Sequence, residues 1–329
     1  PGYEEAGHDY PYGYVRFTER RNMETILQLI SQGDLDVKRL ITHRFDVDEA
    51  ATAYQLIEGD KREPYLGILL QYAALGQNVA DARIATSSQP IDKQKIGISF
   101  YGAGNYATAS LIPPLENSGQ VQFRGLVTAS GRSAQGVATK HGFSFCADKF
   151  DELLTEDTDS VMVTTRHDTH AEAVAGSLSH GKHVYVEKPL ALNMDEMQSI
   201  HAAHLVKPET QLMVGFNRRF SPATKIISEH FSAVQGPLVI NIRVNAGSIP
   251  ADHWIQDPVV GGGRMIGEGC HFVDLAAAIS RSNPVKVYAV GSAKAEKSAL
   301  LNDNLCITLA MENGSVANIT YTADGSKAM

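Results

Sequence analysis

The most informative run of this sequence is Lys95-Ile-Gly-Ile-Ser-Phe-Tyr-Gly102-Ala-Gly104-Asn-Tyr-Ala107. Its first half is an apolar, strand-like run, and its second half is a G-x-G-x-x-A pattern that opens a helix. Gly102 permits a tight turn, Gly104 lets the backbone approach a pyrophosphate, and Ala107 keeps helix and strand close. The helix N-terminus, at Asn105 and Tyr106, offers unpaired N–H groups to phosphate oxygens. The run therefore predicts a dinucleotide site, against the alternative of an ordinary glycine turn.

Strand-like and helical patterns alternate after this turn. Strands are predicted at 96–100, 121–127, 160–164, 183–186 and 211–214, with helices at 171–179 and 194–205. This alternation predicts a doubly wound parallel sheet of Rossmann type. Beyond Phe220 the predicted strands alternate apolar with polar residues, at 238–244, 285–290, 305–311 and 315–321. They favour a C-terminal α/β domain with an open, mostly antiparallel sheet.

A short α/β segment precedes both domains. Its predicted elements are a helix at 23–31 capped by Asn22, a helix that starts at the capping box 46–49, and a strand at 65–70. Residues 73–94, rich in Ala, Gln, Asn, Ser and Pro, are interpreted as a linker. The predicted division is 1–72, the linker 73–94, a Rossmann domain at 95–217 and a substrate and oligomerisation domain at 218–329.

The composition excludes several classes of protein. At roughly 150 residues per domain, 329 residues predict about two domains. A net charge of −8 argues against binding to nucleic acid or to an acidic membrane surface. The longest apolar stretch, 65–76, is too short to span a bilayer, and the charged opening residues do not suit a signal peptide. Three dispersed cysteines predict neither a disulfide framework nor a zinc cluster. We therefore expect a cytoplasmic protein without a metal.

The end of the second predicted Rossmann strand bears on the choice of cofactor. A site that prefers NAD usually places Asp or Glu there to hold the ribose hydroxyls. Residues 125–132 contain no carboxylate and instead supply Ser130 and Arg132. A hydroxyl and a guanidinium suit a 2′-phosphate, so the sequence favours NADP over NAD. The alternative is a solvated turn in which Arg132 binds nothing.

Three further motifs follow in a recognisable order: Gly181-Lys-His-Val-Tyr-Val-Glu187-Lys188-Pro189-Leu190, then 215–222, then 261–274. Together with the Gly102 turn, they resemble the Gfo/Idh/MocA family of glucose–fructose oxidoreductases and inositol dehydrogenases from about Lys95 onward. The resemblance implies a Rossmann domain and an α/β domain whose open sheet carries substrate contacts and homo-oligomer interfaces. It also implies hydride transfer between NAD(P) and a carbon of a sugar, sugar nucleotide or cyclitol.

The resemblance also assigns roles to single residues. Lys188 would lie between nicotinamide and substrate, and His271 would be the acid/base. Glu187 would orient its loop beside the cofactor, Pro189 would fix that loop, and Thr165 would lie at the rim of the cofactor cleft. If the motifs are set aside, the simpler interpretation of Lys188 is a solvent-facing lysine at a strand end. The simpler interpretation of His271 is a hydrogen-bonded histidine at a helix start.

Two departures from the family pattern stand out. The family usually has Asp four residues before the histidine, whereas this sequence has Gly267. Either His271 carries the proton chemistry alone, or the adjacent Glu268 substitutes from another direction. This departure supports a second hypothesis, a catalytically inactive dinucleotide-binding sensor or scaffold. Arg166 replaces a usual proline, and it would either meet an anionic substrate group or be an ordinary surface arginine.

Four other side chains are candidate substrate contacts. Asn217 and Arg218 follow a strand end that faces the cleft, and Asn245 and Trp254 resemble positions of the substrate domain. For Trp254, a stacking platform and an amphipathic core residue are both open. His167 and His170 lack a third partner, so we expect no metal site there.

The front segment has a different resemblance. Residues 3–16, 40–45 and 48–54 look like the tail of a medium-chain, alcohol-dehydrogenase-like enzyme, without that family's nucleotide-binding glycines or zinc ligands. Proteins that join the two families exist, and they imply sugar or sugar-nucleotide metabolism. On this interpretation the sequence is a fragment of a longer polypeptide.

Overall fold

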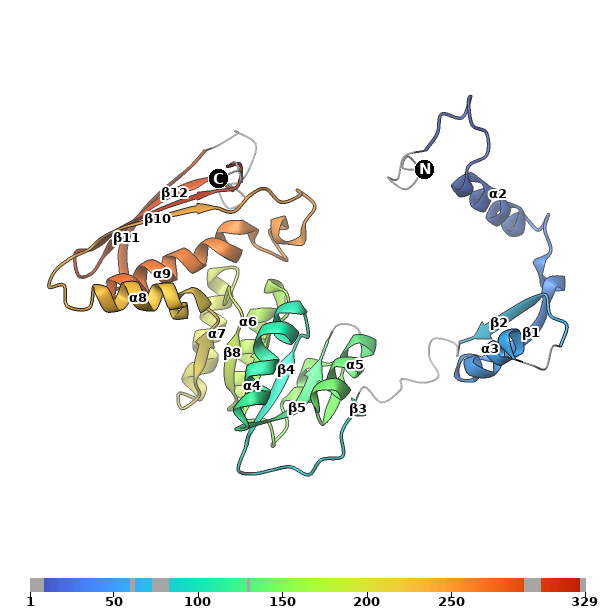
Figure 1. Ribbon diagram of the computed structural model, residues 1–329, viewed down its shortest axis with the longest axis horizontal. Coiled ribbons are helices and arrows are strands. Elements are labelled where there is room, and N and C mark those ends of the chain that lie inside the picture. The colour runs from blue at the N-terminus through green and yellow to red at the C-terminus, as the bar shows by residue number, and fades with distance from the viewer. Residues whose placement is uncertain (1–8, 60–62, 73–82, 129–130, 293–302, 326–329) are drawn as a thin grey trace. The chain divides into compact units, whose positions relative to one another are not determined.

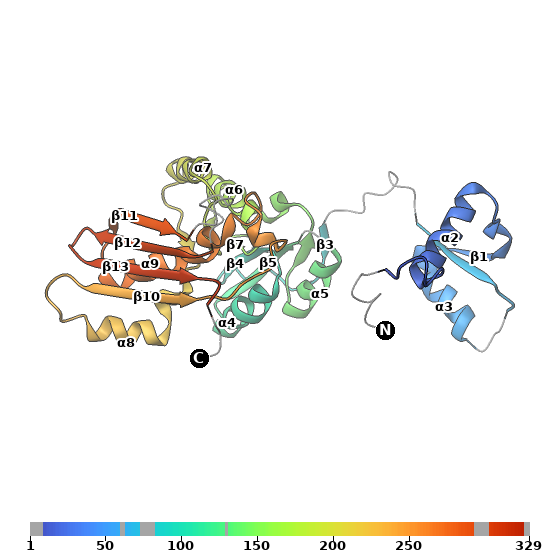
Figure 2. The same cartoon turned by 90° about the horizontal axis from the view of Figure 1, so that it is seen from above.

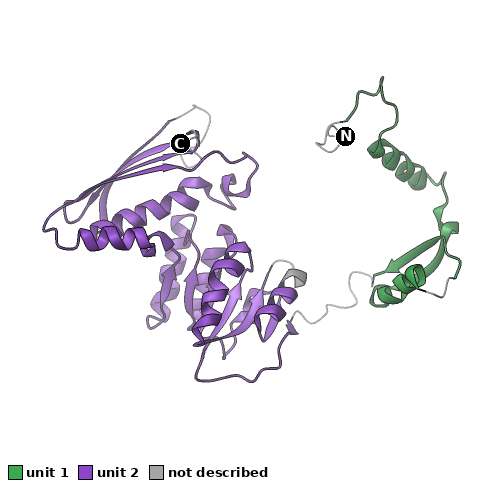
Figure 3. Ribbon diagram, viewed as in Figure 1, with its two compact units in different colours: residues 1–80 green, residues 81–329 purple. Residues whose placement is uncertain are grey.

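The computed structural model describes residues 9–59, 63–72, 83–128, 131–292 and 303–325, apart from the side chains of 131–133. The chain divides into two compact units, 1–80 and 81–329, which Figure 3 colours separately. Within the described ranges, no helix is long and apolar enough to cross a membrane. Each unit is described by itself below.

Among its described residues, the first unit contains two α-helices and a two-stranded parallel sheet. Helix α2 (Glu19–Gln32) begins earlier than predicted, because Thr18 is extended and its Oγ1 accepts the N–H of Arg21. The predicted cap Asn22 therefore lies inside the helix. After η1 (Val37–Leu40), strand β1 (Ile41–Asp46) pairs with β2 (Gly67–Gln71). They are joined through η2 (Val47–Glu49) and α3 (Ala50–Glu58), and Asp46 makes no side-chain capping bond.

The second unit is built on a seven-stranded sheet with the order β3-β6-β5-β4-β7-β8-β9. Its strands are β3 (Arg83–Ala85), β4 (Ile96–Tyr101), β5 (Val121–Val127), β6 (Phe145–Ala147), β7 (Ser160–Val163), β8 (His183–Val186) and β9 (Leu212–Val214). From β4 to β9 the order is 3-2-1-4-5-6, the classical dinucleotide-binding arrangement, and every pair is parallel. Strand β3, which lies inside the stretch predicted as a linker, adds an antiparallel edge to β6.

Helices cover both faces of this sheet (Figures 1 and 2). The elements η3 (Ala107–Leu111), α4 (Ile112–Ser118) and α5 (Gly131–His141) pack on one face, in a core that includes Phe100, Leu126 and Ala138. On the other face lie η4 (Phe150–Leu153), η5 (His167–Thr169), α6 (His170–Ser179) and α7 (Met194–Val206). Because helices cover both faces, a ligand can reach this sheet at the ends of its strands.

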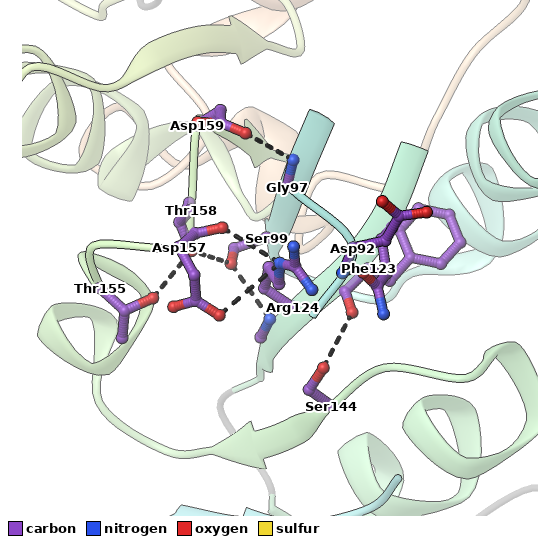
Figure 4. A network of polar contacts seen from close by, with 12 residues as sticks. Asp92, Gly97, Ser99, Phe123, Arg124, Ser144, Thr155, Asp157, Thr158 and Asp159 are labelled. Atoms are coloured by element: carbon purple, nitrogen blue, oxygen red, sulfur yellow. Dashed lines mark hydrogen bonds and ion pairs between the residues drawn. The ribbon is translucent and has the colours of Figure 1, made fainter. Parts of the chain in front are cut away.

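A buried polar network holds the amino end of the sheet, as Figure 4 shows. Arg124 on β5 is 2% exposed, and its Nε donates to the carbonyl of Asp157 at 3.1 Å. The N–H of Gly97 donates to Asp159 at 2.6 Å, and a Cβ at Gly97 would lie 2.0 Å from the carbonyl oxygen of Asp157. The loop before β7 is therefore fixed to the amino end of β4, which leaves the carboxyl end for ligands.

A second, four-stranded sheet follows, with the order β10-β13-β12-β11. The elements of this part of the chain, helices included, are η6 (Asn217–Phe220), α8 (Pro222–His230), β10 (Val239–Asn245), η7 (Trp254–Gln256), η8 (Met265–Gly269), α9 (Cys270–Ser280), β11 (Pro284–Gly291), β12 (Leu305–Met311) and β13 (Val316–Thr322). The pair β10–β13 is parallel and the other two pairs are antiparallel, so the sheet is mixed. One face packs against Phe272 and Ala276 of α9. The predicted fold class, a Rossmann sheet followed by an α/β domain, is confirmed.

Candidate active site

The glycine turn lies at the carboxyl end of β4. Gly102 has φ +107°, and a Cβ there would lie 2.7 Å from the carbonyl of Thr164, so this position requires glycine. A Cβ at Gly104 would meet nothing within 4 Å, and Ala107 is fully buried. Because Thr108 donates back to Gly104, the N–H groups before it lie in the unpaired first turn of the helix. This geometry fits a dinucleotide pyrophosphate.

The other predicted cofactor residues lie in loops at the same end of the sheet. Thr165 Oγ1 lies 2.6 Å from Thr169 Oγ1, and Glu187 accepts a hydrogen bond from Tyr185 at 2.7 Å. The side-chain amide of Asn217 donates to the Tyr106 hydroxyl at 3.1 Å, which joins the motif at 215–222 to the glycine turn. Ser130 and the side chain of Arg132 lie outside the described residues, so the choice between NADP and NAD stays a prediction.

A cavity of about 490 Å³ lies beside these loops. It collects side chains from the end of β8, from η6, from β10 and from the η8–α9 junction. Its lining residues are Lys188, Arg218, Arg243, Val244, Asn245, Ala246, Arg264, Glu268, His271 and Phe272. The structure thus brings together five residues that the sequence singled out, Lys188, Arg218, Asn245, Glu268 and His271.

Lys188 is held at the cavity wall by the residue that departs from the family pattern. Its Nζ donates to the carbonyl oxygen of Gly267 at 2.6 Å, and the Lys188–Pro189 bond is cis. A Cβ at Gly267 would point to His167 and Ile255, at 2.9 and 3.1 Å, among buried side chains. The backbone carbonyl of Gly267 therefore contacts Lys188, and the packing around Gly267 leaves no room for a larger side chain.

We expect Gly267→Ala to lower the free energy of unfolding by about 1–3 kcal/mol, because the added methyl group overpacks a filled site. Urea unfolding followed by circular dichroism measures the change. Gly136→Ala is the matched control, since a Cβ there meets nothing within 4 Å. Equal stability of the two variants would contradict the packing argument.

His271 begins the next helix, α9, and is 8% exposed. Its Nδ1 is buried and makes no hydrogen bond to any residue that the structure describes. Burial, followed by the positive charges of Lys188 and Arg218, lowers the pKa of His271 to about 4. The imidazole is therefore neutral at pH 7, the form that can accept a proton from a hydroxyl group.

Glu268 is fixed by two donors. Its Oε2 accepts hydrogen bonds from Arg264, at 2.9 Å, and from the hydroxyl of Tyr321. Burial acts to raise the pKa of Glu268, but these hydrogen bonds and the charges of Arg264 and Lys188 outweigh it and hold the pKa below its ordinary value. The carboxylate is therefore ionised and oriented at neutral pH, partnered with an arginine that is 2% exposed.

The remaining candidates lie outside the cavity lining. Trp254 packs edge-on against His167 at 4.8 Å between ring centroids, and the Arg166 guanidinium lies 5.5 Å from its ring centroid. His167 and His170, where we expect no metal site, contact backbone carbonyl groups. A ring nitrogen of His167 bonds the carbonyl of Gly261, and the ring nitrogens of His170 bond those of Pro189 and Thr165.

Sequence reasoning passed over Arg243, Arg264 and Tyr321. Arg264 lies within the motif at 261–274. Its spacing of four residues from Glu268 is typical of an ion pair on a helix. Arg243 lies on a strand whose neighbours in space are distant in sequence, so no local signal marked it.

The fold defines a protein with a Rossmann-type dinucleotide-binding domain, and comparison with known families places it further. Residues 96–216 match the model described as "Oxidoreductase family, NAD-binding Rossmann fold", and residues 237–327 match that of the GFO/IDH/MocA C-terminal domain. Over these residues, the chain belongs to the Gfo/Idh/MocA family.

Individual relatives agree with this assignment. The chain is 30% identical over 188 residues to the uncharacterized oxidoreductase YrbE of Bacillus subtilis (strain 168), covering 55% of this chain and 54% of that protein. It is 31% identical over 144 residues to myo-inositol 2-dehydrogenase of Thermotoga maritima, covering 43% and 42%. The chain thus spans about half the length of the curated relatives it matches.

A solved structure supports the fold. Levoglucosan dehydrogenase in complex with NADH and L-sorbose matches with a TM-score of 0.62 at 20% identity, covering 71% of this chain and 68% of that one. At this identity the likeness bears on the fold alone.

Proposed function

We propose that this chain transfers hydride between a nicotinamide dinucleotide and a hydroxyl-bearing carbon of a sugar, sugar nucleotide or cyclitol. The observation that carries the proposal is the meeting of Lys188 and His271 in one cavity. The cavity also includes Arg218, whose neighbour Asn217 bonds Tyr106 of the glycine turn. Family membership and a relative named as myo-inositol 2-dehydrogenase support this class of reaction.

The glycine turn and its surrounding loops would hold the cofactor. Gly102, Gly104 and Ala107 would shape the turn, and the N–H groups of Asn105 and Tyr106 would bind the pyrophosphate. Thr165 and Glu187 would contact the nicotinamide half, while Ser130 and Arg132 would favour NADP. When bound, the nicotinamide supplies the hydride acceptor or donor.

The cavity residues would carry the proton and the developing charge. Neutral His271 takes the hydroxyl proton during oxidation, and the ammonium group of Lys188 stabilises the developing alkoxide. Glu268 contributes a fixed negative charge at the wall. Arg218, Asn217 and Asn245 contact substrate, with Trp254 at the rim.

Two further proposals concern the self-association of the chain and its cellular compartment. The uncovered face of the second sheet, with Tyr288 70% and Val290 53% exposed, suits association with another copy of the chain. The cysteines are all free, in keeping with the cytoplasm as the compartment.

The inactive-sensor hypothesis is the second candidate, and one observation favours it. Gly267 supplies a carbonyl where the family usually supplies a carboxylate, so His271 lacks the usual acidic partner. A sensor binds the dinucleotide tightly but reduces none of it in a single turnover across neutral sugars, cyclitols, sugar acids and sugar nucleotides. Formation of reduced nicotinamide with any of these excludes it.

Cofactor binding is tested by Gly104→Ala. The new methyl group meets no protein atom, so folding is unaffected, but it enters the space proposed for the pyrophosphate. We expect the Kd for NADH and NADPH, measured by fluorescence titration, to rise by about tenfold or more, a loss of roughly 1.4 kcal/mol. Gly136→Ala again serves as control. Unchanged affinity in Gly104→Ala would sink the assignment of the turn.

A further inference from the structure

The proposed active-site cavity carries a marked excess of positive charge. Its lining contains the cations Lys188, Arg218, Arg243 and Arg264, and one carboxylate, that of Glu268. The chain as a whole has a net charge of −8, so this concentration runs against the overall composition. Of these four cations, Arg264 alone has an ion pair with a described carboxylate, that of Glu268 at 2.9 Å.

Arg218 and Arg243 are the two cavity arginines without a carboxylate partner among the residues that the structure describes. Both are exposed to the cavity. The guanidinium of Arg218 lies 4.6 Å from the ring centroid of Phe272, a contact that orients it without neutralising it. The adjacent Arg219, by contrast, pairs with Asp274.

The two arginines approach the cavity from different elements. Arg218 lies in η6, next to the Rossmann domain, and Arg243 lies on β10 of the second sheet. Guanidinium groups bind carboxylate and phosphate oxygens through paired donors, whereas a neutral polyol leaves their charge uncompensated. Two such groups that line one cavity suit a substrate with an anionic group.

We propose that the substrate of this cavity carries an anionic group, a carboxylate or a phosphate, which Arg218 and Arg243 bind. This inference rests on the proposed function. It narrows the substrate class to sugar acids, sugar phosphates or nucleotide sugars and sets neutral sugars and cyclitols aside.

The proposal also bears on His271. Arg218 is one of the two cations that lower the pKa of this imidazole, after the effect of burial. A bound anion offsets part of that positive charge and moves the pKa of His271 toward pH 7, where a general base works best. Asp274 and Glu268, the acidic groups that act on His271, already shift it in the same direction.

The test compares four probes that differ in charge: glucose, glucuronate, glucose 6-phosphate and UDP-glucuronate. Binding of each to the protein saturated with NADH or NADPH is measured by calorimetry. We expect at least one anionic probe to bind about tenfold or more tightly than glucose, and Arg218→Gln/Arg243→Gln to remove about 10- to 100-fold of that affinity. Glucuronate and glucose 6-phosphate separate a carboxylate from a phosphate as the recognised group.

Arg44→Gln is the matched control, because Arg44 is an exposed strand arginine in the first unit and is not among the residues that line this cavity. Equal binding of neutral and anionic probes, or an anion preference that survives the double substitution, would overturn the inference. Failure of the wild-type protein to bind NADH or NADPH would instead overturn the proposed function, so the two failures are distinguishable.

Discussion

Replacing His271 by asparagine is expected to lower kcat by about 10²- to 10⁴-fold, the usual contribution of a general base. Asparagine preserves polarity at this largely buried position but does not accept a proton at neutral pH. His271 lies on the cavity wall, away from the glycine turn in sequence, so the Kd for NADH should not change. Formation of reduced nicotinamide and NADH titration measure the two quantities separately.

The matched control is His201→Asn, which changes an exposed histidine of α7 outside the cavity. We expect it to retain full kcat. A His271→Asn variant with normal kcat would remove His271 from the mechanism. A variant that lost NADH binding as well as turnover would indicate a structural role for this residue.

Lys188→Met is expected to reduce kcat by about 10²- to 10³-fold, comparable to the loss of one donor from an oxyanion site. Methionine keeps an unbranched side chain but lacks the ammonium group and its hydrogen bond to Gly267. Lys286→Met, an exposed substitution on β11, is the control and should leave kcat unchanged.

The pH profile separates an electrostatic role of Lys188 from a merely structural one. The charge of Lys188, together with burial and Arg218, holds the pKa of His271 at about 4, while Asp274 and Glu268 act in the opposite direction. Removing that charge raises the pKa. Oxidation needs neutral His271, so the acid limb of kcat/KM should move to higher pH in Lys188→Met. An unchanged limb would contradict the proposed coupling.

Much of the fold was predictable from local patterns. The strands predicted at 121–127, 183–186 and 305–311 coincide with β5, β8 and β12, because each is an apolar or alternating run with clear ends. The three-residue strands β3 and β6 were missed, since they are too short to show a period. Their places in the sheet are set by the pairing of β6 with β5 and of β3 with β6, which local sequence does not encode.

The candidate site was predictable only where motifs marked it. Lys188 and His271 were found through their motifs, and the structure places both in one cavity. The effect of Gly267 was not foreseeable, because it depends on the close approach of His167 and Ile255. Arg243 was missed for a related reason: it lines the same cavity as Arg218 only in the folded chain, where β10 and η6 both reach that cavity.

The parallel pairing of β10 with β13 has a consequence for biosynthesis. Asn241 contacts Asn318, a residue 77 positions later in the chain. Contacts between such distant residues form late, and unpaired strand edges invite aggregation in the meantime. Strand β13 lies between β10 and β12, so a strand that is synthesised after both of its neighbours completes the sheet from its interior. Until then, the nascent chain holds β10 without its partner.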